Sequence, residues 1–234
     1  QRGGPSTGLP TNVEQSDLNI ACFGGHGDSP RVVLAAANVE DCFYTAMEAV
    51  DIARRYSVPV MLLSDQAIAT RIEAFDEPKL EEICQDLTPD LTPPPTHKPY
   101  DLETKIGASR HRAPGTRIED GRYPVVTGLE HDEWGHPSAS PDLHEGMTHK
   151  RRNKLNALAD ELPIPEVYGA DSGEVLVVGW GSTTGPLYEA VEKSGNNGQA
   201  ISALKLRHIS PLPKGLEEIF SRFKKIYVVE MNDG

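Results

Sequence analysis

The chain has 234 residues, 38% of them hydrophobic, and a formal net charge of −12 at pH 7. This length predicts about one and a half to two domains. The acidic balance argues against a nucleic-acid partner, which would require a basic surface, and no apolar run approaches the roughly 20 residues that cross a bilayer. We therefore expect neither nucleic acid nor a membrane among its partners.

The first predicted elements are a strand, a helix and a second strand. Residues 32–35 are apolar and predict a strand, and the helical period that follows begins at Asn38, a favourable N-cap, and ends near Tyr56. Residues 58–63 then predict another wholly apolar strand. A crossover helix between two strands buried on both faces indicates a parallel sheet. We interpret residues 1–85 as the back part of an α/β domain whose earlier strands lie upstream.

The middle of the chain, residues 86–172, predicts a linker and irregular arm with a short helix. Residues 86–121 are rich in proline and charge, and a loop this long is either functional, intersubunit or a solvated tether. Residues 123–149 lack any period, and residues 148–162 predict the helix. The basic triplet at residues 150–152 is interpreted as a solvated helix face or a partner contact.

Residues 173–234 predict a second α/β unit that is doubly wound. The pattern gives strands at 175–180, 201–206 and 225–229, with helices at 186–193 and 216–223 between them. The loop at 181–185 joins a strand to a helix, where anions can bind. It lacks the lysine of a P-loop, so we interpret it as a packing loop.

The opening loop, residues 1–11, suits a small carboxylate. Arg2 offers a planar fork of donors, and Ser6, Thr7 and Thr11 add hydroxyls. Glycines let the backbone approach a ligand closely. A plain surface turn is the alternative, and for Ser6 and Thr7 ligand contact and turn capping are equally supported.

Two further residue groups could carry chemistry. His131, Asp132, Glu133 and His136 could bind Zn²⁺ by residue type, but a hydrogen-bonded loop is the favoured interpretation. His144 and His149 are interpreted as surface or helix-capping residues. The three cysteines form no Cys-x-x-Cys pair and cannot supply the four thiolates of an iron–sulfur cluster. Unpaired cysteines of this kind favour a cytoplasmic location.

Several strings resemble the alpha subunit of the 2-oxoacid:ferredoxin oxidoreductases along essentially the whole chain. They lie at residues 1–18, 23–28, 59–66, 127–133 and 147–151. The resemblance implies part of a pyrimidine-type thiamine diphosphate domain with a parallel sheet, followed by a doubly wound domain like the C-terminal domain of transketolases. It also implies CoA-dependent oxidative decarboxylation of a 2-oxoacid to acyl-CoA and CO₂, with electrons passed to ferredoxin. The 127–133 loop favours 2-oxoglutarate.

By the same resemblance, Arg2 binds the substrate carboxylate, Thr11 lies in the same pocket, and Asp132 or His131 lines it. The implied cofactors are thiamine diphosphate with Mg²⁺, held with a beta subunit, and iron–sulfur clusters on another chain, with coenzyme A as co-substrate. The glutamate that activates thiamine in this family precedes the Arg2 loop. We therefore expect an internal fragment that lacks both ends and is inactive alone.

Two alternatives stay open from the sequence. One is another thiamine diphosphate enzyme, either transketolase-like or of the indolepyruvate type. The other is a non-catalytic α/β interaction module.

Overall fold

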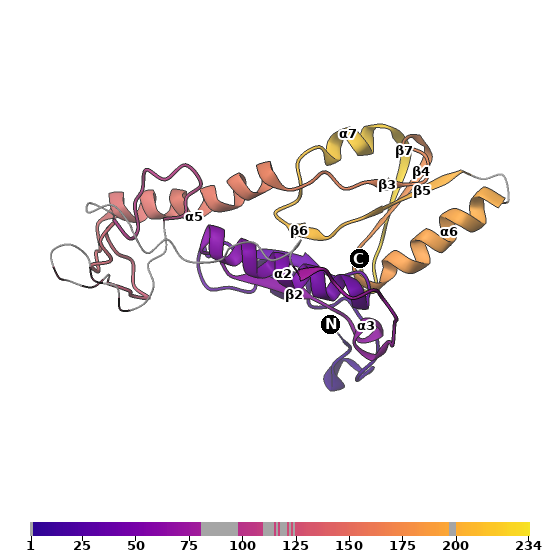
Figure 1. The fold of residues 1–234 in the computed structure, drawn as a ribbon, viewed down its shortest axis with the longest axis horizontal. Helices are drawn as coiled ribbons and strands as arrows, with labels where there is room; N and C mark the ends of the chain where they lie inside the picture. Colours follow the sequence, from indigo (N-terminus) through magenta and orange to yellow (C-terminus); the bar gives the residue numbers. More distant parts are fainter. Residues whose placement is uncertain are drawn as a thin grey trace.

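The computed structural model describes residues 2–80, 98–109, 115, 117, 121, 123, 125–196 and 200–234, and within them the chain builds two sheets (Figure 1). The first sheet has the strand order β2-β1-β6 and the second β3-β5-β4-β7. The strands are β1 (Val32–Ala35), β2 (Val60–Leu63), β3 (Val167–Tyr168), β4 (Gly173–Gly179), β5 (Ile201–Lys205), β6 (His208–Ser210) and β7 (Phe223–Val229). The helices are η1 (Pro5–Thr7), α1 (Leu18–Phe23), α2 (Val39–Tyr56), α3 (Gln66–Thr70), α5 (Pro141–Glu161), η2 (Gly181–Thr183), α6 (Thr184–Asn196) and α7 (Leu216–Ser221).

The first unit follows the predicted strand, helix and strand. β1 and β2 are parallel, and α2 connects them. Asn38 caps α2, its side chain accepting a hydrogen bond of 2.7 Å from the amide of Asp41. β1 is buried throughout. The prediction that both strands are buried on both faces is wrong for β2, because β2 is the edge strand of the described sheet and is largely half-exposed.

Helix α5 belongs to the core of the first unit at its C-terminal end. Leu158 and Leu162 pack with Leu34 of β1 and with Ile52 and Tyr56 of α2. The helix begins at Pro141 and not near residue 148 as predicted. Proline at the first helical position, after Ser140 at the N-cap, explains the earlier start. Figure 1 shows the rest of α5 extending away from the sheets.

The second unit is doubly wound, as predicted. β4 is parallel to both β5 and β7, and β3 is antiparallel to β5. Leu187 of α6 lies against Gly179 on one face of the sheet. Leu216 and Ile219 of α7 pack with Leu176 and Val178 on the other face. Because successive residues of β4 point to opposite faces of the sheet, α6 covers one face and α7 covers the other. The helix predicted at 186–193 runs further at both ends.

Two short strands, β3 and β6, were not predicted, and β6 ties the two units together. β6 follows β5 of the second sheet but pairs antiparallel with β1 of the first, with Val33 opposite Ser210. The first sheet is therefore mixed and not purely parallel. Figure 1 shows the chain around β6 passing from the second unit to the first.

Other sequence-based expectations have mixed outcomes. Cys22 and Cys42 are free thiols in half-buried positions, and Cys84 lies outside the described residues. Most of the proline-rich stretch also lies outside them, and the described residues 98–109 form turns. The domain boundaries at 85 and 172 stay predictions. No helix in the described part of the chain is long and apolar enough to cross a membrane.

Candidate functional site

The loop that contains Arg2 folds back on itself through backbone hydrogen bonds. The amide of Gly3 donates to the carbonyl of Asn12 at 2.9 Å, and the amide of Thr11 donates to the carbonyl of Gly3 at 3.1 Å. Gly3 is buried, and a Cβ atom there would lie 2.1 Å from the carbonyl oxygen of Leu9. Only glycine allows this close approach, so Gly3 fixes the position of its neighbour Arg2.

Arg2 lies on the surface of this loop with its charge free. Its side chain is exposed and, among the described residues, makes no hydrogen bond or ion pair. Thr11 is also exposed, has a positive φ of 61°, and donates its hydroxyl to the carbonyl of Pro10 at 2.6 Å. Ser6 is exposed within η1. The side chain of Thr7 lies outside the described set. The same loop thus carries an exposed guanidinium and two hydroxyl groups on exposed residues.

The loop is held where the carboxyl ends of strands from both sheets converge. The backbone amide of Gln15, just after the loop, donates to the carbonyl of Met231, beyond β7, at 2.9 Å. Asp65, just after β2, accepts a hydrogen bond of 3.0 Å from the amide of Ser182, which follows β4. Carboxyl ends of parallel strands are where α/β proteins place ligands.

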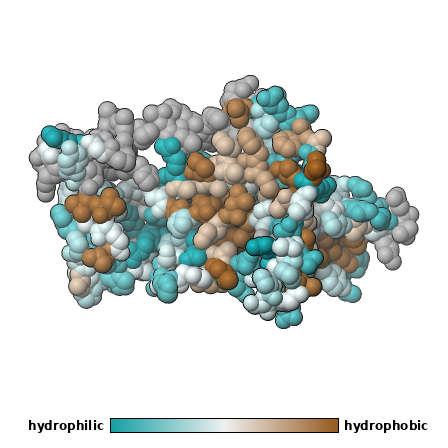
Figure 2. Space-filling view, turned by 90° about the horizontal axis from the view of Figure 1, so that it is seen from below, coloured by the Kyte–Doolittle hydropathy of each residue, from teal (hydrophilic) through white to brown (hydrophobic). Residues whose placement is uncertain are grey.

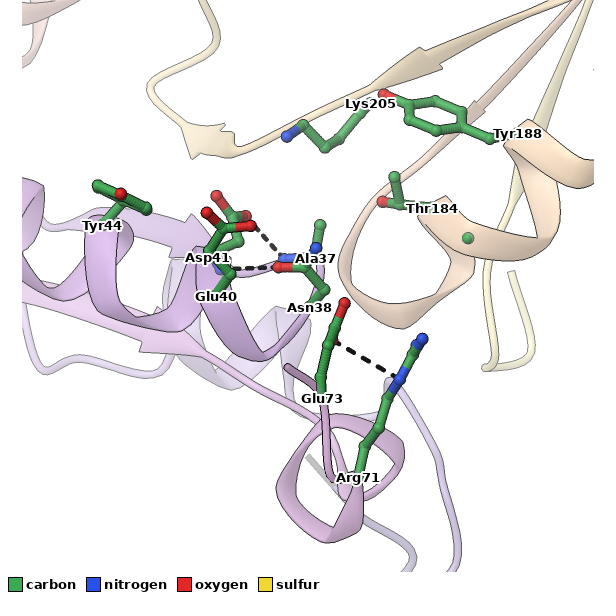
Figure 3. Close-up of a pocket in the computed structure, with 11 residues that line it drawn as sticks. Ala37, Asn38, Glu40, Asp41, Tyr44, Arg71, Glu73, Thr184, Tyr188 and Lys205 are labelled. Carbon is green, nitrogen blue, oxygen red and sulfur yellow. Dashed lines mark hydrogen bonds and ion pairs between the residues drawn. The ribbon is translucent and has the colours of Figure 1, made fainter. Parts of the chain in front are cut away.

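An open cleft of about 440 Å³ lies beside this junction, between α2 and α6 (Figure 3). Figure 3 shows Lys205 and Tyr188 on one side, with Glu40 and Asp41 on the other. The described residues contain no hydrogen-bond or ion-pair partner of Lys205. The whole lining is Ala37, Asn38, Glu40, Asp41, Tyr44, Arg71, Glu73, Thr184, Gly185, Tyr188 and Lys205.

The chain's own carboxylates occupy the α2 side of the cleft. The amide of Val39 donates to Glu73 at 3.2 Å, and the amide of Ala37 donates to Asp41 at 2.8 Å. Glu73 also pairs with Arg71 at 3.6 Å. Because carboxylates already meet these backbone donors, the N-terminus of α2 is filled and does not offer an anion site.

Asp132 is engaged within its own turn. Its Oδ1 accepts 2.9 Å hydrogen bonds from the amides of Trp134 and His136. Burial opposes ionisation, but these hydrogen bonds outweigh it and lower the pKa of Asp132. Figure 1 shows the segment before α5 far along the long axis from the N-terminus. The structure therefore does not bring Asp132 together with Arg2 in this chain, and its role in the substrate pocket stays a prediction.

The neighbours of Asp132 are also paired. The ring of His131 lies 4.0 Å from that of Tyr100, between centroids. Glu133 binds Lys98 at 2.8 Å and the amide of Leu102 at 3.0 Å. The described residues contain no group of three or more His, Cys, Asp or Glu side chains placed to hold a metal ion.

Two polar clusters on α5 were not found from the sequence. Glu130 accepts two hydrogen bonds from Arg151, at 3.1 and 3.0 Å, and these, helped by His144, lower its pKa to about 2 against the effect of burial. Lys150 is buried beside Tyr100 and donates to Ser109 at 3.1 Å. Burial lowers its pKa to about 8. The interpretation of this basic triplet as a solvated face is therefore wrong for Lys150, because the preceding arm covers it.

The 181–185 loop serves packing in the described structure. Thr183 and Thr184 donate their hydroxyls to the carbonyls of Trp180 and Gly181, at 2.7 and 2.9 Å. The backbone amide of Ser182 donates to Asp65. These three polar groups of the loop are therefore already hydrogen-bonded within the protein.

Comparison with known proteins gives consistent matches. The family model described as pyruvate flavodoxin/ferredoxin oxidoreductase, thiamine diphosphate-binding, matches residues 1–148. The chain is 37% identical to the 2-oxoglutarate oxidoreductase subunit KorA of Mycobacterium tuberculosis, covering all of this chain and 35% of that protein. It is 32% identical to the 2-oxoglutarate synthase subunit KorA of Methanothermobacter marburgensis, covering 61% of that protein.

A solved structure is similar over nearly the same span. The 2-oxoglutarate:ferredoxin oxidoreductase from Magnetococcus marinus, with 2-oxoglutarate, coenzyme A and succinyl-CoA bound, superposes with a TM-score of 0.89 at 38% identity. The match covers 98% of this chain and 40% of that one. This chain therefore spans less than two thirds of each of these relatives.

Proposed function

Because the chain belongs to the pyruvate flavodoxin/ferredoxin oxidoreductase family, we propose that it is part of the alpha-type subunit of a 2-oxoacid:ferredoxin oxidoreductase. The proposed reaction is CoA-dependent oxidative decarboxylation to acyl-CoA and CO₂, with electrons passed to ferredoxin. The observation that carries this proposal is similarity along the full chain to relatives named for 2-oxoglutarate, including one solved with that substrate. 2-Oxoglutarate is therefore the favoured substrate.

Arg2 supplies the substrate-binding chemistry. A guanidinium fork matches a carboxylate with two parallel hydrogen bonds and keeps its charge at all working pH values. Arg2 is exposed and has no competing partner among the described residues. Holding the 2-oxoacid carboxylate orients the bond that breaks on decarboxylation. Thr11 and Ser6 lie on the same loop as further polar contacts, and Thr7 and Asp132 remain candidates from the sequence.

Thiamine diphosphate, when bound, supplies the nucleophilic carbon for decarboxylation. The described residues do not include the groups that would bind its diphosphate and metal ion. The sequence has no Gly-Asp-Gly motif for a metal-bound diphosphate, and the described residues form no metal-ligand cluster. We assign the diphosphate and Mg²⁺ to a beta subunit and the iron–sulfur clusters to another chain.

The surface of the first unit supports a partner subunit. Figure 2 shows apolar side chains gathered near the middle of the face seen from below. Exposed apolar residues in this unit include Phe23, Met61 on the edge strand β2, and Ile72, which is fully exposed. A large exposed apolar area is typical of a protein interface. We infer that the beta subunit covers this face and that the complex works in the cytoplasm.

The test is reconstitution of the full-length subunit with its beta subunit. We expect CoA-dependent reduction of ferredoxin with 2-oxoglutarate and a lower kcat/KM with pyruvate. The 234-residue chain by itself serves as the control and should be inactive. Equal kcat/KM for both acids would overturn the substrate assignment, and no reduction with any 2-oxoacid would overturn the proposed reaction.

A further inference from the structure

The second unit has a crevice where doubly wound proteins usually bind ligands. β4 connects through α6 to β5 on one side, and after β5 the chain runs through β6 and α7 to β7 on the other side of β4. The carboxyl ends of β4 and β7 therefore flank the topological switch point of the sheet. In folds of this strand order the ligand lies at that point.

In this chain the side chain of Gln15 occupies the crevice. Gln15 is fully buried, and its Nε2 donates to the carbonyl of Trp180, next to β4, at 2.9 Å. Its Oε1 accepts from the amide of Met231, beyond β7, at 2.8 Å. Asn232 donates its side-chain amide to the carbonyl of Gln15 at 3.1 Å. Both ends of the amide are thus satisfied by backbone at the switch point.

The fit around Gln15 is close. Gly181 has a φ of 64°, and a Cβ atom there would lie 2.9 Å from Nε2 of Gln15. Any other residue at position 181 would be strained and would crowd the amide. The crevice is therefore shaped as a socket for this side chain.

Gln15 lies only three residues along the backbone from Asn12, which closes the base of the Arg2 loop. The carbonyl of Asn12 accepts a hydrogen bond from the backbone amide of Gly3, and the carbonyl of Gly3 accepts one from the backbone amide of Thr11. Gly3 adjoins Arg2. Fixing Gln15 therefore fixes the base of the loop that presents the guanidinium and the hydroxyl of Thr11.

We propose that Gln15 is a positioning residue for substrate binding, and that the switch-point crevice is its socket and not a ligand site. This inference rests on the proposed function for its kinetic consequence. Its structural part, that the socket orders the loop, stands independently of substrate.

The amide is specifically required because it donates at one atom and accepts at the other. A carboxylate of the same shape accepts only, so it would face the carbonyl of Trp180 with oxygen against oxygen and bury an unpaired charge. A protonated carboxyl regains one donor. Gln15→Glu should thus be defective at neutral pH and partly restored on mild acidification, whereas Gln15→Met should not be restored.

The experiment compares Gln15→Glu and Gln15→Met in the full enzyme complex, with Gln66→Glu, a half-exposed residue on α3, as the matched control. We expect kcat/KM for 2-oxoglutarate to fall by about tenfold or more, mainly through KM, while KM for CoA is unchanged. General destabilisation would instead lower the apparent kcat per total protein, because fewer molecules would be active, and would leave both KM values unchanged. An unchanged KM for 2-oxoglutarate in both variants would overturn the proposal.

Hydrogen exchange without substrate separates this proposal from the proposed function. The hydrogen-bonded amides of Gly3, Thr11 and Asn12 should exchange faster in both Gln15 variants than in Gln66→Glu. If the wild-type enzyme lacks 2-oxoacid activity but exchange responds as expected, the function fails and the socket stands. Unchanged exchange at these amides would refute the socket. Should both variants fail to assemble, Asn232→Ala, which removes one hydrogen bond to Gln15, replaces them under the same criteria.

Discussion

Nε2 of His208 lies 2.6 Å from Oε1 of Glu48, and this contact joins β6 to the middle of α2. Arg207 binds the other oxygen of Glu48 at 3.2 Å and also pairs with Asp41. His208 is buried. The unpredicted strand β6 is therefore fixed to the first unit by charged side chains as well as by its pairing with β1.

Replacing His208 should loosen this attachment. His208→Phe leaves one oxygen of Glu48 without its donor, which should cost about 1–3 kcal/mol. His208→Gln can still donate and should cost less. Hydrogen exchange of β6 and the middle of α2 measures the effect. Equal protection in His208→Phe and the wild type would mean that strand pairing alone holds β6.

The same contact predicts a pH dependence. Burial raises the pKa of Glu48, but the hydrogen bond and charge of His208, together with Arg207, outweigh it and leave the pKa below the ordinary 4.5. A lowered folded-state pKa contributes stability that is present above the unfolded value and lost as the pH falls below it. The difference in exchange between wild type and Glu48→Gln should thus be largest near neutral pH and shrink below about pH 4.5. A difference that grows on acidification would contradict the assignment.

Glu130 and Arg151 should stabilise the arm against acid in the same direction. The pKa of Glu130 is lowered to about 2, so its contribution is complete above about pH 4.5 and is lost progressively toward pH 2. After allowing for partial solvent screening, Glu130→Gln should cost about 1–2 kcal/mol at neutral pH. Exchange in residues 125–150 measures it. Glu174→Gln is the control, because its partner Lys224 and Glu174 itself are both highly exposed, and it should change nothing.

Much of the fold could be predicted because its signals are local. Asn38 marks the start of α2, and the apolar runs at β1, β4 and β5 reveal buried strands. β6 could not be predicted, since its three residues carry no period and pair with a strand some 170 positions away. The sequence predicts that α5 begins near residue 148, but the helix begins at Pro141, where Ser140 and Pro141 are ordinary start signals.

The candidate site likewise contains residues that the sequence alone identifies and residues that only the fold identifies. Arg2 and Thr11 could be selected from residue type and resemblance. The part played by Gln15 could not, because it depends on Trp180 and Met231, which only the fold brings to it. The burial of Lys150 likewise depends on where the arm lies.

Gly3→Ala tests whether the loop backbone sets the position of Arg2. The new methyl group would lie 2.1 Å from the carbonyl oxygen of Leu9, so the loop must shift. We expect KM for 2-oxoglutarate to rise by about tenfold, as for loss of one hydrogen bond to a charged group. Gly195→Ala on α6, with open space around its Cβ, is the control and should stabilise its helix by about 0.5–1 kcal/mol. Unchanged kinetics in Gly3→Ala would show that the loop tolerates the shift.

Arg2 itself gives the most direct test of the site in the complete enzyme. Arg2→Ala removes a bidentate contact worth about 1.5–3 kcal/mol per hydrogen bond to a charged group, so kcat/KM for 2-oxoglutarate should fall about tenfold to more than a hundredfold. Stability should barely change, because the guanidinium is exposed and has no partner among the described residues. Arg2→Lys should recover part of the loss, since an ammonium keeps the charge but not the fork. Thr11→Val deletes one neutral hydroxyl and should lower kcat/KM less than Arg2→Ala does.

The control for these variants is Arg54→Ala, which replaces an exposed arginine on α2 and is measured in the same kinetic assays and thermal melts. If Arg2→Ala kept full kcat/KM while lowering the melting temperature, Arg2 would support the loop and not hold the substrate.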